Sequence, residues 1–481
     1  MRSRRFLFVV VIAALIAAAL AAGRGASARS STPPRATVTP NASVLSQSET
    51  VWFCPGLPPA LPHAAARVTF ANIGDATADV VVTDLADNGS SSHVTLEVKA
   101  KTVVTRGRDA LGVPGSLTVE TFGGRVLVEE GIDGAGALET TPCATETSPH
   151  WYFAAGTTPR GVQQWLVIDN PYASDARVDI TLRTSAGVRR PDALQGLDIT
   201  RRTREVIAIH DIAVRLDRVS VAVDAEVGSV VAAQTLVYSS AAGTPGVAST
   251  LGSPAASTEW TFAGQLDHAG ASAVVAIANV GDDDAQVDVQ ATAESGKATI
   301  APTSLTVAQD DVVWVQLGRC AAGAKACIAI PDGVRYSLDV RSEQDVSIVA
   351  QTLTRFAGGT GDVGTVTALG GIEPARSWAF ARSSVVGEQS TTLSFFNPGA
   401  DPVSVNVATV RRGTVGRSHV LQNVSVPPGR AVTVDVFGGT GSKPPKLDAA
   451  LTVDASEPIF VLRSIDATDE AATSVGAVVA N

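Results

Sequence analysis

The chain has 481 residues, of which 45% are hydrophobic and 17% are charged. This composition can bury sizeable cores and excludes global disorder, and the length suffices for three or four domains. The formal net charge is −10, and loss of the first 28 residues, which carry four arginines and no acid, leaves 33 basic and 47 acidic residues, or −14. We therefore expect no nucleic acid partner, because nucleic acid binding needs basic patches.

The chain begins with arginines and continues with an uncharged, apolar stretch over residues 6–23 and a small-residue site, Ala26-Ser27-Ala28. This pattern predicts that residues 1–28 are a signal peptide or an N-terminal membrane anchor. Either alternative places the rest of the chain outside the cytoplasm, secreted or anchored to the cytoplasmic membrane, since the arginines stay inside. Residues 29–49 are rich in serine, threonine and proline and are predicted to form an extended linker.

A tryptophan followed 19 or 20 residues later by an asparagine occurs four times after the linker. The pairs are Trp52 with Asn72, Trp151 with Asn170, Trp260 with Asn279, and Trp378 with Asn397. A spacing of about 100 residues between the tryptophans is that of a domain, whereas propeller blades and solenoid coils repeat at shorter periods. We therefore expect four repeats, at 50–146, 147–256, 257–374 and 375–481.

Apolar residues alternate on both sides of each asparagine, two and four positions before it and eight and ten positions after it, as in Val68, Phe70, Val80 and Val82. Spacing of two predicts half-buried strands, and the Gly, Pro and Asp residues between them predict a turn that the asparagine side chain starts. Short strands with frequent turns favour an all-β fold of four tandem immunoglobulin-like β-sandwich repeats over a closed barrel or a propeller. The tryptophans are expected to pack in the cores, and the modules to pack end to end.

Four cysteines in an exported chain predict two disulfides, for which three pairings exist. Sequence position favours Cys54–Cys143 and Cys320–Cys327. Cys54 stands where the other repeats have Phe153, Phe262 and Phe380, so a disulfide is expected to replace an inward aromatic ring.

Signatures of catalysis and of cofactor or metal binding are absent from the sequence: it has no nucleophile elbow, no Walker loop, no dinucleotide fingerprint and no zinc spacing. His210 and Asp211 are adjacent, but a strand would point them to opposite faces. The acidic turn Asp282-Asp283-Asp284 lacks a calcium-binding spacing and is interpreted as a solvated loop, as is Asp310-Asp311. We therefore expect a protein without enzymatic activity, cofactor or metal.

Two tryptophans lie outside the repeated pattern. Trp165 is expected to point outward by its parity with the inward Leu166, and together with Arg160 it is a candidate contact surface. Trp314, in an apolar strand, is a candidate for burial.

The Trp-x-Phe-Ala starts, the run from Gly156 to Gly161 and the Asn170-Pro171 turn resemble an uncharacterised family of exported or membrane-anchored actinobacterial proteins, a domain of unknown function. The resemblance implies the cell envelope and brings no catalytic residues. We expect a structural or binding protein of the bacterial envelope. One alternative is an accessory of envelope polysaccharide assembly that binds a glycan or a membrane glycosyltransferase complex, and another is an envelope hydrolase.

Overall fold

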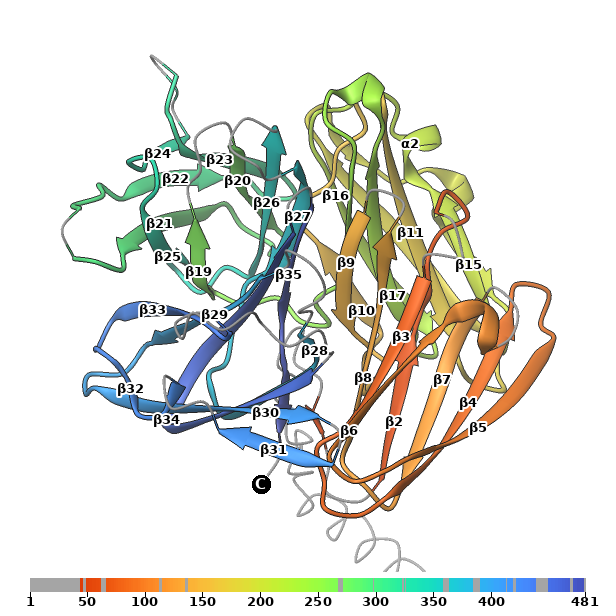
Figure 1. Ribbon diagram of the computed structural model, residues 1–481. Coiled ribbons are helices and arrows are strands. Elements are labelled where there is room, and N and C mark those ends of the chain that lie inside the picture. Colours follow the sequence, from red (N-terminus) through yellow and green to blue (C-terminus); the bar gives the residue numbers. More distant parts are fainter. Residues whose placement is uncertain are drawn as a thin grey trace, which may run out of the picture. The chain divides into compact units, whose positions relative to one another are not determined.

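The structure, a computed structural model, describes residues 44–45, 49–61, 66–111, 115–134, 137–266, 271–296, 298–321, 324, 326–357, 363–383, 390–411, 413–417, 421–437, 449–467 and 470–479. The predicted leader and most of the predicted linker lie outside these residues. The described part is almost entirely β-structure, as expected, and the strands fall into four segments: 49–142, 150–251, 259–369 and 375–479 (Figure 1). No described helix is both long and apolar enough to cross a bilayer.

Segments 1 and 2 each contain two sheets. The elements of segment 1 are β2 (Glu49–Cys54), β3 (Ala66–Asn72), β4 (Ala78–Ala86), β5 (Ser91–Val98), β6 (Thr102–Gly107), η2 (Arg108–Ala110), β7 (Gly115–Phe122), β8 (Val126–Gly134) and β9 (Ala137–Pro142). Those of segment 2 are β10 (His150–Phe153), β11 (Val162–Asn170), β12 (Ala176–Thr184), β13 (Gly187–Arg189), η3 (Asp192–Leu194), β14 (Leu197–Ile199), β15 (Thr203–Ala208), α2 (Ile209–Ile212), β16 (Val219–Val227), β17 (Val231–Tyr238), η4 (Ser240–Ala242) and β18 (Gly246–Leu251).

Segments 3 and 4 follow the same plan. Segment 3 contains β19 (Glu259–Leu266), β20 (Ala271–Asn279), β21 (Ala285–Ala293), β22 (Thr303–Val307), β23 (Val312–Gly318), β24 (Cys327–Ala329), β25 (Arg335–Ser342), β26 (Ile348–Ala357) and β27 (Val363–Leu369). Segment 4 contains β28 (Ala375–Ser383), β29 (Ser390–Asn397), β30 (Val403–Arg411), β31 (Thr414–Arg417), β32 (Val424–Val426), β33 (Arg430–Asp435), β34 (Ala449–Ala467), β35 (Glu470–Val475) and β36 (Ala477–Val479).

The strand order is the same in every segment. In segment 1 it is β2-β7-β4-β5 in the first sheet and β6-β3-β8-β9 in the second, and segments 2 and 3 repeat both orders with small additions. In segment 4 the long strand β34 runs through both sheets, pairing with β28 and β30 by its first half and with β29 and β35 by its second. The strand before each asparagine and the strand after it therefore belong to different sheets.

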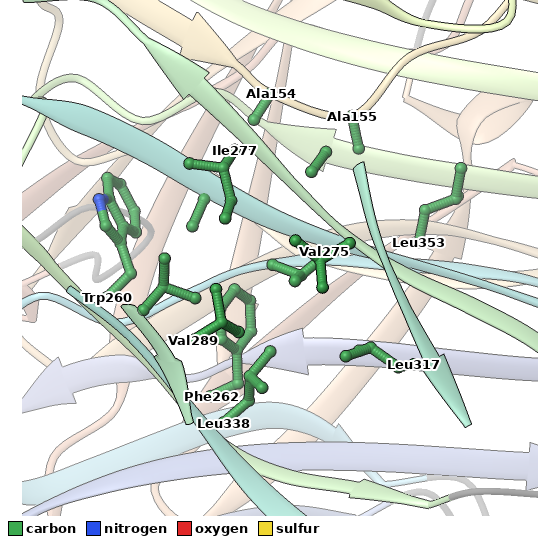
Figure 2. Close-up of a cluster of buried hydrophobic side chains, with 14 of the residues drawn as sticks. Ala154, Ala155, Trp260, Phe262, Val275, Ile277, Val289, Leu317, Leu338 and Leu353 are labelled. Atoms are coloured by element: carbon green, nitrogen blue, oxygen red, sulfur yellow. The ribbon is translucent and has the colours of Figure 1, made fainter. Parts of the chain in front are cut away.

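One hydrophobic core fills the space between the two sheets of a segment. In segment 3, Trp260, Phe262 and Leu338 from the first sheet meet Val275 and Ile277 from the second (Figure 2). The four repeat tryptophans are at most 2% exposed, which confirms that they are core residues. Three of the four indole N–H groups also donate to a backbone carbonyl of the second sheet, those of Trp151, Trp260 and Trp378.

Each repeat asparagine is buried and makes the same three hydrogen bonds. Its Oδ1 accepts from the backbone N–H two residues on, and its Nδ2 donates to the carbonyl four residues on and to the last residue of an edge strand, at 2.8–3.1 Å in every segment. For Asn279 the partners are Gly281, Asp283 and Val307. The predicted turn-starting role is confirmed, and the same amide also fixes the edge strand of the opposite sheet.

Both predicted disulfides are present. Cys54 is bonded to Cys143 and Cys320 to Cys327. Disulfides are typical of proteins that fold in an oxidising compartment outside the cytoplasm.

The structure also explains why the aromatic ring could be exchanged for the first disulfide. In segments 2 to 4 a glycine follows the last strand of the second sheet at the place of Cys143, and the ring of the segment's phenylalanine occupies the space that a Cβ there would need. The pairs are Gly252 with Phe153, Gly370 with Phe262, and Gly476 with Phe380. The sequence therefore keeps either a ring facing a glycine or two bonded cysteines.

Contacts between the segments close a cycle, which differs from the expected end-to-end packing. The last strands β9, β18, β27 and β35 each contact the next, and β35 contacts β9. The end of the third strand of each segment also touches the start of β15, β23, β33 or β6, which are the equivalent strands of the following segment. These contacts are Asp87 with Arg204 (2.6 Å), Arg183 with Asp310 (2.7 Å), Ala293 O with Arg430 (3.3 Å), and Gly413 N with Lys101 O (2.8 Å), the last of which joins segment 4 to segment 1.

The closure of segment 4 on segment 1 has a buried ionic centre. Glu129 accepts from Arg463, which is fully buried, at 2.9 Å, and also accepts from the backbone N–H of Ala381 at 2.9 Å. Gln351 occupies the place of Glu129 in segment 3 and accepts from Ala155 N of segment 2 at 2.9 Å. Strand β1 (Val44–Leu45) adds to the closure, because it pairs in parallel with β36 although its residues fall in the range predicted as linker.

A second set of buried charges lies between segments 1 and 2. Asp169 accepts from Ser116 at 2.5 Å, and Arg204 donates to the carbonyls of Pro55 and Leu57 at 3.1 Å. Burial raises the pKa of Asp169 to about 7, although the Ser116 bond and then Arg204 oppose the rise. Burial likewise raises the pKa of Asp84 to about 6 against the pull of Arg108 and Arg204. The pocket beside Arg108, Glu130 and Arg204 has a volume of about 10 Å³, room for roughly one water molecule.

Replacing one repeat asparagine should destabilise the protein strongly. Asn279→Ala would leave the carbonyls of Asp283 and Val307 and the N–H of Gly281 without their partner. We expect the free energy of unfolding to fall by about 2–4 kcal/mol, because buried polar groups lose their hydrogen bonds. Urea unfolding measures this, with Asn88→Ala as the control, since exposed Asn88 also caps a turn by accepting from Ser90 N. Equal losses in both variants would contradict the assigned role.

The buried carboxyl of Asp169 should make the protein less stable at alkaline than at mildly acidic pH. Because the folded state raises its pKa from 3.8 to about 7, folding is favoured at low pH by proton uptake, and this contribution is lost as pH rises through 7. Asp169→Asn keeps an acceptor for Ser116 and removes the ionisation. We expect it to raise the free energy of unfolding at pH 8 by roughly 1–3 kcal/mol and to change it little at pH 4. Urea titrations between these pH values give the measurement, and a gain that is the same at both would contradict the argument.

Candidate functional site

A polar patch lies on the outward face of the first sheet of segment 3. The strand register places Glu259, Arg341 and Asp288 side by side across β19, β25 and β21, and places Thr261, Asp339 and Gln290 in the adjacent row. Side chains directly opposite on neighbouring strands have Cβ atoms about 5 Å apart, so the six side chains form one surface. The core residues Trp260, Val340 and Val289 alternate with them and point inward.

Hydrogen bonds orient most of this patch. Arg341 donates to Glu259 at 2.6 Å, and Thr261 Oγ1 donates to Asp339 Oδ1 at 2.8 Å. Gln290 Nε2 donates to the carbonyl of Ala291 at 2.6 Å, and Ser304 on β22 donates to Asp288. The side chains are therefore held in place before any ligand arrives, which reduces the entropy lost on binding.

The opposite wall of the site is apolar and belongs to segment 4 and to the link that precedes it. Phe396 and Phe460 lie next to each other on β29 and β34, with ring centroids 6.4 Å apart, and Ile372, Pro374 and Pro398 complete the wall. The cleft between this wall and the polar patch has a volume of about 480 Å³. This volume lies in the range of small-ligand sites, about 300–1,000 Å³.

The residue that follows the repeat tryptophan differs at the cleft. Backbone bridges from the residue after the tryptophan to the start of the link are equivalent in three segments: Phe53 with Ala144, Tyr152 with Ser253, and Thr261 with Gly371. Phe53 packs into the core cluster of segment 2, and Tyr152 packs against that of segment 3. At the junction of segments 3 and 4 the corresponding residue is Thr261, which is buried and lines the cleft together with Phe396 and Phe460 of segment 4.

The cleft contains one carboxyl group with a shifted pKa. Burial raises the pKa of Asp339 to about 6, the Thr261 hydrogen bond lowers it, and nearby Glu259 raises it and Arg341 lowers it to smaller extents. A raised pKa is common in catalytic acids, so the position of a second carboxylate matters.

Of the two other carboxylates in the patch, Glu259 is paired with Arg341 and Asp288 leans away from Asp339. In the sheet order β19-β25-β21-β22, Asp339 on β25 bonds toward β19 through Thr261, whereas Asp288 on β21 bonds toward β22 through Ser304. Paired-carboxylate hydrolysis needs two groups that face the same bond. In the described residues, no group of three or more His, Cys, Asp and Glu side chains is arranged to hold a metal ion. The arrangement can thus accept and donate several hydrogen bonds to a bound molecule.

The candidate contact surface of the sequence analysis lies elsewhere, on segment 2. Trp165 is half-buried on β11 with its ring edge-on to His210 at 4.9 Å, and Arg160 is exposed in the turn before this strand. His210 and Asp211 lie in the short helix α2 rather than in a strand, so the expectation that they point to opposite faces of a strand is wrong: His210 Nε2 is 3.9 Å from Asp211 Oδ1.

The other singled-out residues have structural roles. Asp282, Asp283 and Asp284 form an exposed turn in which the Asp283 carbonyl accepts from Asn279 and the Asp284 side chain accepts from Gln309 N at 2.8 Å. Trp314 is half-buried and packs against the segment 3 core. The cleft residues were missed from the sequence. The signal that could have found them is the departure of Thr261 from the aromatic residues at the same place in the first two repeats.

Comparison with known proteins identifies a family but no activity. The profile of the Family of unknown function (DUF5719) matches residues 125–437. No curated protein matches the chain. Among solved structures, "Thermotoga maritima 1070" is 16% identical over 22% of this chain and 94% of its own, with a TM-score of 0.20. A tetra-tandem repeat in the extending region of a large adhesion protein is 14% identical over 90% of this chain and 99% of its own, with a TM-score of 0.11. Streptomyces avermitilis α-L-rhamnosidase complexed with L-rhamnose is 10% identical over 87% of this chain and 54% of its own, with a TM-score of 0.12.

Proposed function

The chain belongs to the Family of unknown function (DUF5719), and we propose that it is a non-catalytic, extracytoplasmic binding protein of the bacterial cell envelope. The observation that carries the proposal is the cleft beside Thr261, where the chain leaves a space of about 480 Å³ between an oriented polar surface and an apolar wall. In the first two segments the residue equivalent to Thr261 is instead aromatic, Phe53 or Tyr152, and packs against the core of the next segment.

Features of the leader and of the folded part both support a location in the cell envelope. The leader arginines and apolar stretch favour export, by a cleaved signal peptide or a retained anchor. The two disulfides favour an oxidising compartment. The Trp-x-Phe-Ala starts support the resemblance to exported actinobacterial proteins.

The scaffold is proposed to be four tandem immunoglobulin-like sandwich repeats. The two sheets sharing one core in each segment support this description. Immunoglobulin constant domains order their sheets ABED and CFG, whereas here the first strand pairs with the sixth, so the likeness concerns the sandwich architecture rather than the strand order.

A hydrolase is the second candidate, and the raised pKa of Asp339 is the observation that favours it. The divergence of Asp288 from Asp339 weighs against it, because an acid needs a nucleophile or base on the other side of the same bond. Release of new reducing ends from envelope fragments by the full chain, lost in Asp339→Asn, would overturn the non-catalytic assignment.

Filling the cleft should abolish binding without unfolding the protein. Thr261→Tyr introduces the residue that segment 2 carries at the equivalent position, Tyr152, so the fold is expected to accommodate it. We expect soluble envelope fragments to raise the Tm of the full chain and to leave the Tm of Thr261→Tyr unchanged. Differential scanning fluorimetry measures both.

Trp165→Ala is the matched control, because it alters the candidate surface on segment 2 and leaves the cleft intact. It should respond to the fragments like the unmodified chain. A response that survives in Thr261→Tyr and disappears in Trp165→Ala would move the binding site to the outer face of β11.

A further inference from the structure

We propose that the cleft between segments 3 and 4 binds a short neutral saccharide of one or two sugar rings. The inference rests on the proposed binding function and names the class of its ligand. Hydroxyl groups would contact the polar patch, and the C–H face of a ring would lie against the apolar wall.

The polar patch offers both kinds of hydrogen-bonding partner that sugar hydroxyls need. Asp288 and Asp339 supply acceptors, Arg341 supplies donors, and the carbonyl oxygen of Gln290 adds an acceptor because its nitrogen already donates to Ala291. A hydroxyl both donates and accepts, so it can be satisfied between a carboxylate and a guanidinium, and hydrogen bonds to charged groups are the stronger ones.

The apolar wall suits the less polar side of a sugar. Pro374, Pro398 and Ile372 present rigid or branched aliphatic surface, and Phe396 and Phe460, each less than 10% exposed, line the same wall. The cleft is therefore two-sided, polar on one face and apolar on the other. A thin ligand with polar groups on one side and apolar groups on the other matches this division.

Charge disfavours anionic ligands, and the sheet order excludes the addition of a peptide strand. Glu259, Asp288 and Asp339 outnumber Arg341, which is already paired with Glu259, so a phosphate or carboxylate ligand would meet net negative charge. The patch lies on the face of β25, which is hydrogen-bonded on both sides to β19 and β21, so no free strand edge is available there to add a peptide strand. An organic amine remains compatible with the acids and is the class that the experiment must separate.

The test is binding of defined probes to the full chain, followed by saturation-transfer-difference NMR and isothermal titration calorimetry. The saccharide probes are methyl glycosides and disaccharides of hexoses, deoxyhexoses, N-acetylhexosamines and pentoses, and the comparison probes are putrescine and inorganic phosphate. We expect at least one saccharide to bind, with affinity lowered by about tenfold or more in Gln290→Ala and Asp339→Asn and lost in Thr261→Tyr. Trp165→Ala should bind like the unmodified chain.

The outcomes separate this inference from the function on which it rests. Binding of putrescine but of no saccharide, with loss in Thr261→Tyr, would overturn the ligand class and keep the binding function. Saccharide binding that Thr261→Tyr leaves intact would overturn the site. Absence of binding by every probe overturns the saccharide inference, and if envelope fragments also fail to change the Tm, the proposed function falls with it.

Discussion

The buried asparagine of each segment is the constraint on which the rest of the structure depends. It stands where the chain leaves one sheet and enters the other, a place where backbone groups would be buried without strand partners. Its side chain satisfies the turn and the end of an edge strand at once, with three hydrogen bonds in every segment. Because an unsatisfied buried carbonyl is costly, this amide fixes the crossing between the sheets and hence the core that forms between them.

The four segments close on one another through contacts at equivalent positions, and the side chains at these positions differ between segments. Glu129 and Gln351 occupy equivalent places and both cap a backbone N–H of another segment, but Glu129 also pairs with buried Arg463. Removing one partner of such a buried pair is expected to cost more than removing the neutral glutamine, because the other charge stays buried alone. The closure of segment 4 on segment 1 is thus the junction that depends most on an ion pair.

The sequence predicted what recurs within a segment and missed what joins segments. Trp260, Asn279 and the alternating valines reveal the core because each is set by local periodicity, and the cysteine pairing was predicted from the positions of the four cysteines in the sequence. Glu129 and Arg463 are 334 residues apart, and no local pattern connects them. The cleft draws on strands β19, β21 and β25 and on a wall from another segment, so its residues become neighbours only through sheet register and segment packing.

Scaffold and site occupy alternate residues of the same strand. In Trp-x-Phe the tryptophan and phenylalanine point into their own core, so the middle residue must point outward, toward the neighbouring segment. That residue is Phe53, Tyr152, Thr261 and Ala379 in the four segments, and Phe53 and Ala379 belong to the core clusters of segments 2 and 1 respectively. A change at the middle position therefore alters a junction without disturbing the core. Thr261 shows the division, since it lines the cleft while Trp260 and Phe262 on either side remain buried in the core.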